Sequence, residues 1–235
     1  YVMLSDSYFS NRLRNMFPAC FNLNGELDTT CTDITTLRRL DIHAPIVNGS
    51  LVPMYNINGI QYFDSLRYLN CAGNALSSIF QLPPYLDTLI CNSQYDPGFI
   101  NGYRFGALPP LPPTLTYLDI SHNGFDSLRH LNEGLRWLNC NGNSVHLSGG
   151  FDRPSMRYID SLPSTLEYLD CSANALTALP RLPAGLQVLK AANNRFVVNI
   201  IPYSFNFPGI ACLPVLPASL DTLRVTGNQP ITCLP

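Results

Sequence analysis

Residues 162–190, LPSTLEYLDCSANALTALPRLPAGLQVLK, hold the pattern that decides the fold. Leu166 is followed three positions on by Leu169, then by the small apolar position of Cys171, and Asn174 lies five residues beyond the second leucine. We call each copy of this pattern a rung, and the chain has eight. Their leucine pairs are Leu37/Leu40, Leu66/Leu69, Leu86/Leu89, Leu115/Leu118, Leu135/Leu138, Leu166/Leu169, Leu186/Leu189 and Leu220/Leu223. Six rungs carry the Asn, at Asn74, Asn123, Asn143, Asn174, Asn194 and Asn228.

The spacing of the rungs predicts a repeat solenoid. A repeat of about 20 residues or more is typical of chains that stack one structural unit on the next. Successive rungs begin 29, 20, 29, 20, 31, 20 and 34 residues apart, so long and short members alternate. Each rung centre predicts a short buried strand, and we expect the strands to stack into one parallel sheet with a concave face. The buried Asn is expected to satisfy backbone groups where each strand turns away.

The long members carry inserts rich in tyrosine, phenylalanine, isoleucine and valine. Because these side chains are apolar, we expect the inserts to pack on one another at every second rung, as short strands along one edge or the convex side. Examples are residues 92–110 and 192–214.

The first 36 residues carry no rung and predict a cap. Apolar residues at helical spacing indicate a short helix that begins at Asp6 or Ser7 and stops before Pro18. A cap is required because an open solenoid end exposes its leucine core and an unpaired strand edge. We therefore divide the chain into a cap, residues 1–36, and a solenoid, residues 37–235.

The eight cysteines fall into two groups. Four occupy the small apolar position of a rung and are expected to be buried free thiols: Cys71, Cys91, Cys140 and Cys171. Cys20 with Cys31, and Cys212 with Cys233, lie near the two ends and are expected to form disulfides, which indicates an oxidising, extracytoplasmic location. The alternative is eight reduced thiols in a cytosolic protein. A zinc site is disfavoured because no CxxC or HxxxH spacing occurs.

Composition and charge exclude several partners. The net charge is −2 with no cluster of Lys and Arg, which disfavours nucleic acid and anionic membranes. No apolar run approaches the ~20 residues that span a bilayer. The four histidines are scattered outside any nucleophile motif, so we predict no enzyme activity, no cofactor and no metal site.

The rungs, prolines and cap together resemble the leucine-rich repeat superfamily. The pattern LPxLPxx before LxxLxCxxNxLxxLP is similar to its 20-residue subclass. Two groups share that pattern: bacterial type III effectors with LPx repeats, and secreted or surface leucine-rich repeat proteins of Bacteroidetes. CFNLNGELDTTC, residues 20–31, followed by GIQYFDSLRYLNCAGNALSSI, residues 59–79, resembles the cap and first regular repeat of the second group. The resemblance covers residues 8–235 and implies a mostly β horseshoe and an outer-surface destination.

The outward positions of the strands supply the candidate site. The residue before each second leucine is aromatic in four rungs, and the residue after it is Asp or Asn in five. The strip selected from these positions comprises Tyr68, Tyr117, Trp137, Tyr168, Asp119, Asn139 and Asp170. Rings and short polar side chains suit recognition of a ligand. The alternative is a stabilising ladder, because aromatics also stack across strands without any ligand.

These features predict a secreted, cell-surface or outer-membrane-associated binding module that recognises a protein or glycan through its concave face. Two alternatives remain open. One is a structural subunit of a bacterial outer-surface assembly that docks other surface proteins through its inserts. The other is a secreted effector that acts on a host protein.

Overall fold

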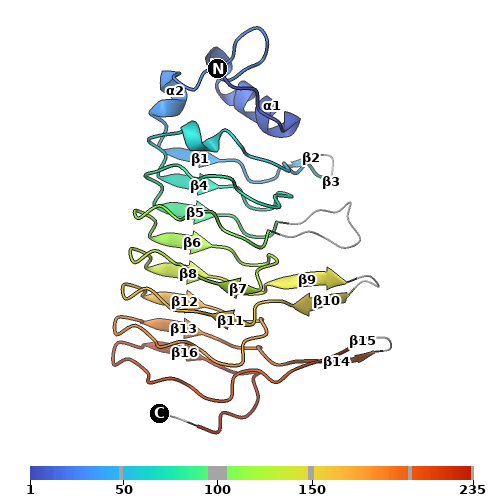
Figure 1. The fold of residues 1–235 in the computed structure, drawn as a ribbon, viewed down its shortest axis with the longest axis vertical. Helices are drawn as coiled ribbons and strands as arrows, with labels where there is room; N and C mark the ends of the chain where they lie inside the picture. The colour runs from blue at the N-terminus through green and yellow to red at the C-terminus, as the bar shows by residue number, and fades with distance from the viewer. Residues whose placement is uncertain (48–49, 95–104, 148–150, 201–202, 234–235) are drawn as a thin grey trace.

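A computed structural model describes residues 1–47, 50–94, 105–147, 151–200 and 203–233. These residues build an elongated stack of strands with helices at the N-terminal end (Figure 1). Eight three-residue strands form one parallel sheet in the order β1-β4-β5-β6-β8-β12-β13-β16. Their bounds are Arg39–Asp41, Tyr68–Asn70, Thr88–Ile90, Tyr117–Asp119, Trp137–Asn139, Tyr168–Asp170, Val188–Lys190 and Thr222–Arg224.

The register of this sheet follows the leucines. Each second leucine pairs with the second leucine of the next rung, beginning with Leu40↔Leu69 and ending with Leu189↔Leu223. The first seven second leucines are fully buried, whereas Leu223 in the last strand is 39% exposed. Since successive side chains of a strand alternate in direction, this register places the leucines in the core and two other columns on the opposite face. We call that face the sheet face. The predicted solenoid of eight rungs is confirmed.

A ladder of buried amides runs behind the sheet. Asn174 donates Nδ2 to the carbonyls of Cys140 and Cys171, both at 3.0 Å, and its Oδ1 accepts from the Asn143 N–H at 3.0 Å. The same bridge between a rung and the rung before it recurs at Asn74, Asn123, Asn143, Asn194 and Asn228. The structural role predicted for the Asn is therefore present at all six positions.

The third rung uses Gln94 in place of Asn, which the sequence pattern missed. Gln94 Nε2 donates to the carbonyl of Cys71 at 2.8 Å, and its Oε1 accepts from the Leu76 N–H at 3.1 Å. The chemistry is the same because Gln carries the same amide on a longer stem. Its position, five residues after Leu89, is the signal that could have found it.

The N-terminal cap is anchored by one carboxylate. Helix α1, Ser7–Met16, begins at Asp6, whose Oδ1 accepts from the Phe9 N–H at 2.9 Å. The other oxygen of Asp6 accepts from the N–H groups of Tyr55 and Asn56, at 2.7 and 3.0 Å. One side chain thus caps the helix and ties it to the first long repeat. Phe9 and Leu13 of α1 are fully buried against the first rungs.

Three short helical segments complete the cap and the first repeat. They are η1, Pro18–Cys20; α2, Thr32–Thr35; and η2, Ile60–Tyr62. The predicted stop at Pro18 is confirmed, since α1 ends at Met16. Within the described residues, no helix is both long enough and apolar enough to cross a bilayer.

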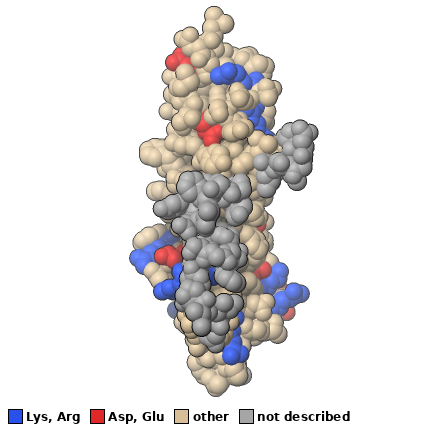
Figure 2. Space-filling view, turned by 90° about the vertical axis from the view of Figure 1, so that its right-hand side faces the viewer, with Lys and Arg blue, Asp and Glu red and all other residues tan. Residues whose placement is uncertain are grey.

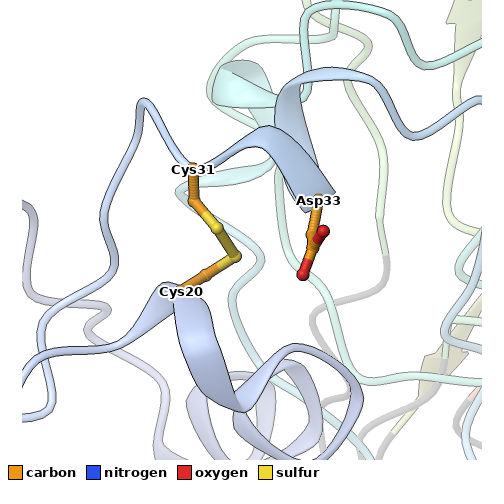
Figure 3. A group of neighbouring side chains, drawn as sticks. All are labelled: Cys20, Cys31 and Asp33. Atoms are coloured by element: carbon orange, nitrogen blue, oxygen red, sulfur yellow. A yellow bond between two sulfur atoms is a disulfide. The ribbon is translucent and has the colours of Figure 1, made fainter.

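Both end pairs of cysteines are bridged. Cys20 is bonded to Cys31 and Cys212 to Cys233, with Cα–Cα distances of 5.4 and 4.8 Å. Asp33 lies beside the first bridge, and Figure 3 shows its carboxylate next to the two sulfurs. A metal would need thiolates as ligands, and both sulfurs of this group belong to the disulfide. The group is therefore a structural bridge with a neighbouring carboxylate.

Three long members fold their inserts as antiparallel hairpins. These are β2–β3, Ile46–Val47 with Ser50–Leu51; β9–β10, Ser144–Leu147 with Phe151–Pro154; and β14–β15, Phe196–Ile200 with Tyr203–Phe207. All three extend from the same side of the stack (Figure 1). Short strands along one edge or the convex side were predicted, and strands form, but each described hairpin is a separate two-stranded sheet and does not pair with the next one. Of the insert at 92–110, residues 95–104 lie outside the described residues.

A further small parallel sheet joins two neighbouring rungs behind the main sheet. It consists of β7, Ser127–Leu128, and β11, Tyr158–Ile159. Leu128 and Ile159 are buried, so this pairing extends the core.

Removing one amide of the ladder should destabilise the whole stack. The substitution Asn174→Ala leaves the buried N–H of Asn143 without its acceptor and removes one of the two amide donors from each of the carbonyls of Cys140 and Cys171. A buried group left unsatisfied costs about 1–3 kcal/mol, and the missing side chain adds lost packing. We expect a loss of about 2–4 kcal/mol in the free energy of unfolding, measured by urea denaturation. The matched control is Asn206→Ala on the exposed face of β15, which should change stability by less than about 0.5 kcal/mol. Equal effects of the two substitutions would contradict the role of the ladder.

The rung thiols should be inert in the folded protein. Cys71, Cys91, Cys140 and Cys171 are fully buried, and burial raises the pKa of each thiol, to about 12 for Cys71. Because the thiolate is the reactive form, a thiol reagent should label none of them quickly in the native state. After denaturation we expect four labelled cysteines without a reductant and eight with one. Eight labelled cysteines without reduction would show that the end pairs are open.

Candidate functional site: the aromatic row of the sheet face

Three rings of the predicted strip stack on neighbouring strands. Tyr117 on β6, Trp137 on β8 and Tyr168 on β12 occupy equivalent register positions. The centroids of Tyr117 and Trp137 lie 4.0 Å apart with the planes 5° from parallel, and those of Trp137 and Tyr168 lie 4.7 Å apart at 11°. Parallel strands bring equivalent side chains to this spacing, so the stack is a direct consequence of the register.

Cations lie at both ends of the aromatic positions. The guanidinium of Arg39 lies 3.5 Å above the ring centroid of Tyr68, and Lys190 donates Nζ to the hydroxyl of Tyr168 at 2.8 Å. Tyr68 itself is not part of the stack, because Thr88 lies between it and Tyr117 in the register. The structure therefore brings together three of the four predicted rings and leaves Tyr68 two rungs from Tyr117.

The polar column beside the rings is joined by hydrogen bonds. Asp119 is 8% exposed, and its Oδ1 accepts from the N–H and hydroxyl of Ser121 at 3.0 and 2.7 Å. Its Oδ2 accepts from Asn92 and Asn139, at 3.3 and 3.4 Å. Asp170 accepts from the Ser172 N–H at 3.1 Å and lies 3.9 Å from Lys190 Nζ. Asp119 is thus a fixed acceptor that holds the column, and Asn139 and Asp170 border the rings.

Two groups of the sheet face have shifted pKa values. Burial raises the pKa of Tyr117 to about 12, and the nearby carboxylate of Asp119 contributes in the same direction. Burial also raises the pKa of Asp41, but hydrogen bonds from the side chain and backbone of His43 outweigh it and hold that pKa below its ordinary value. Tyr117 is therefore a neutral phenol and Asp41 a carboxylate at neutral pH.

The geometry gives the ring stack a structural role. The faces of Trp137 are covered by Tyr117 and Tyr168, and such pairs are worth about 0.5–1.5 kcal/mol each. The three rings are half-buried, so their edges reach the solvent side of the sheet face. A partner would meet ring edges and a polar border. The role of Tyr68, Tyr117, Trp137, Tyr168, Asp119, Asn139 and Asp170 in binding a ligand stays a prediction.

The insert side of the molecule carries no single-sign patch over its described residues. Figure 2 shows basic and acidic residues side by side among a majority of uncharged residues. Examples of mixed pairs elsewhere are Arg136 with Glu167, and Arg129 with Asp160 at 3.8 Å. This distribution gives no run of phosphate-binding cations.

Comparisons with known proteins found two partial similarities. No family model matches it. Toll-like receptor 9 of Canis lupus familiaris is 33% identical over 127 residues, which is 50% of this chain and 11% of the receptor. A structure of YopM from Yersinia enterocolitica WA-314 aligns with 77% of this chain and 48% of its own at 23% identity, with a TM-score of 0.37. The leucine register and the amide ladder decide the architecture. The fold is a leucine-rich repeat solenoid.

This leucine-rich repeat chain thus spans about a tenth of the curated receptor it matches.

The pKa of the Tyr117 phenol should lie well above the ordinary tyrosine value of about 10. In a titration followed by ultraviolet absorbance, the difference between the wild type and Tyr117→Phe should show one phenolate step near pH 12. The substitution Asp119→Asn should lower that step, because it removes a negative charge that opposes the phenolate. Since the folded-state pKa is raised, Tyr117 stabilises the fold below pH ~10, and this contribution is lost as the pH rises toward 12. A step at the ordinary pKa of tyrosine would contradict the packing of this ring.

Proposed function

We propose that the chain is a non-enzymatic binding module that recognises a protein partner through the sheet face, centred on Tyr117, Trp137 and Tyr168. The observation that carries the proposal is the row of stacked rings whose edges face solvent beside a column of Asp and Asn. Rings held rigidly by stacking lose little conformational entropy on binding, and the polar column supplies directional hydrogen bonds.

The polarity of the sheet face supports a protein partner. Its charged groups are of both signs: Arg39 and Lys190 flank the rings, while Asp41, Asp119 and Asp170 line the polar column. Mixed charge beside aromatic area is typical of protein interfaces and unsuited to polyanions. A glycan is the alternative ligand and is an outcome of the tests below.

The location that we propose is extracytoplasmic, on a cell or outer-membrane surface or secreted. The disulfides Cys20–Cys31 and Cys212–Cys233 support it, because such bridges persist in oxidising compartments. The motif resemblance to surface proteins of Bacteroidetes supports it as well, and the relative that matches half of this chain is named as a receptor. The same bridges argue against an effector that works in a reducing cytoplasm.

A second candidate is a structural subunit that docks a surface assembly through its inserts. The observation that favours it is the projection of β2–β3, β9–β10 and β14–β15 from one side of the stack (Figure 1). Two-stranded sheets leave unpaired edges that can add a strand from a partner.

Photo-crosslinking distinguishes the two candidates. A crosslinking amino acid placed at Val188 probes the sheet face, and one placed at Val197 on β14 probes the hairpins. If the sheet face binds the partner, the Val188 probe should capture it in native extracts and the Val197 probe should not. Capture from Val197 alone would replace the proposed function with the second candidate.

The captured protein then serves as the ligand for variants. Trp137→Phe keeps a ring in the stack but removes the outer edge of the indole, so we expect affinity to fall about tenfold, measured by calorimetry. The control Arg181→Ala alters an exposed residue on the proline-rich edge and should leave affinity unchanged. Unchanged affinity of Trp137→Phe would mean that the stack only stabilises the sheet.

A further inference from the structure

We propose that the third rung holds a slot, above Thr88 and between Tyr68 and Tyr117, that receives one aromatic side chain of the protein partner. The inference rests on the proposed function and specifies what the partner presents. The slot is defined by two facing rings as walls and by Thr88 and Ile90 as its floor.

The contacts of each wall show which way its free face points. The guanidinium of Arg39 covers Tyr68 from the first rung, at 3.5 Å from the ring centroid. The opposite face of that ring is therefore turned toward the third rung. Tyr117 stacks on Trp137 of the fifth rung at 4.0 Å and 5°, so its opposite face is turned toward the third rung as well. The two free faces look at each other across Thr88.

The side chains of the floor, Thr88 and Ile90, are smaller than the rings of the walls, and the Thr88 hydroxyl already has a partner. Thr88 pairs with Tyr68 on one side and with Tyr117 on the other, and its hydroxyl donates to Asp87 Oδ1 at 2.8 Å. The next outward position of the same strand is Ile90, whereas the neighbouring rungs have Asn70 and Asp119 there. Among the second to sixth rungs, the third is thus the one where both columns of the sheet face lose their usual side chains.

The nearest long cation is directed elsewhere. Arg67 precedes Tyr68, but its Nη1 donates to the carbonyl of Tyr85 at 3.2 Å and its guanidinium lies 5.4 Å from the ring centroid of Tyr85. It therefore reaches toward the proline-rich edge.

The slot is wide enough to admit one planar ring but too narrow for two. Two strand spacings separate Tyr68 from Tyr117, or about 9.6 Å. A flat ring in van der Waals contact with both walls needs about 7–8 Å, since carbon atoms meet at about 3.5–4.0 Å. The chain contains the filled version of this arrangement, because Trp137 lies between Tyr117 and Tyr168 at 4.0 and 4.7 Å. At Thr88 the same site lacks its ring.

The polar atoms around the slot favour an aromatic side chain over a sugar. Asp119 has both oxygens engaged, by Ser121 and by Asn92 and Asn139. Asn70 donates to Asp41 and accepts from the Ala72 N–H. The hydroxyl groups of a buried sugar would need partners that these groups already provide to one another, and an unpaired buried hydroxyl is costly. An aromatic ring needs no hydrogen bond from the residues of the floor.

The test fills the slot from within. In Thr88→Trp the new indole takes the place of the ligand, whereas Thr222→Trp adds the same residue at the equivalent position of β16, away from the slot. The probes are N-acetyl-tryptophanamide and methyl glucoside, and their binding is measured by saturation-transfer NMR. We expect the tryptophan compound to bind the wild type and Thr222→Trp, and to bind Thr88→Trp about tenfold more weakly or not at all. Methyl glucoside should not bind.

Several outcomes would overturn the slot. Unchanged binding of the tryptophan compound to Thr88→Trp would place its site elsewhere, and binding of methyl glucoside that Thr88→Trp blocks would make the slot a sugar site. If Thr88→Trp does not fold, Tyr68→Ala removes one wall without filling the floor and should weaken the tryptophan compound similarly. Retained binding to Tyr68→Ala would then reject the slot.

The captured partner separates this inference from the proposed function. Loss of partner affinity in Trp137→Phe with full affinity in Thr88→Trp would leave the binding face intact and reject the slot. Loss in both variants, with full affinity in Thr222→Trp, supports both. Full affinity in both Trp137→Phe and Thr88→Trp would reject both.

Discussion

The stack depends on one constraint, the need to satisfy backbone carbonyls that each rung leaves inside a dry core. Each strand has only three residues. The carbonyl of the residue that follows it, such as Cys140 or Cys171, has no partner in the neighbouring strand. The amide at the fifth position after the second leucine bridges its own rung to the preceding one, as Asn174 does between Cys171 and Cys140. An amide is suited to this because it donates two hydrogens and accepts on its oxygen. Every neighbouring pair of rungs is thereby linked at the same height.

The positions of the functional residues follow from that link. Because the amides link equivalent positions of successive rungs, the strands pair in register. That register puts equivalent outward residues about one strand spacing apart. Tyr117, Trp137 and Tyr168 stack because they are equivalent and adjacent. Thr88 opens a slot between two rings for the same reason, since one short residue in a regular column leaves a gap one rung wide. Because the column is otherwise regular, a residue that departs from it, such as Thr88, marks a local change in the surface.

The sequence predicted the residues that repeat from rung to rung better than those that occur once. Residues that repeat were predicted well: the leucine core, the role of the Asn and the burial of the rung cysteines all follow from their position in the rung. Gln94 was missed because the pattern was read by residue type, although the amide is what matters. The inserts were expected as strands at one edge, but three of them form separate hairpins, and no sequence period specifies how a single insert pairs. The tie from Asp6 to Tyr55 and Asn56 spans about fifty residues and left no local signal.

By itself, the sequence determined the solenoid, its eight rungs and the two columns of the sheet face, because these are set by spacing along the chain. Only the tertiary structure decided which rings touch, which cations cover them and where the row is interrupted. Those contacts join rungs 20 to 31 residues apart, and they depend on side-chain directions that the register alone imposes. The strip foreseen as four aromatic residues is in the folded protein a stack of three rings, with a fourth ring facing it across Thr88.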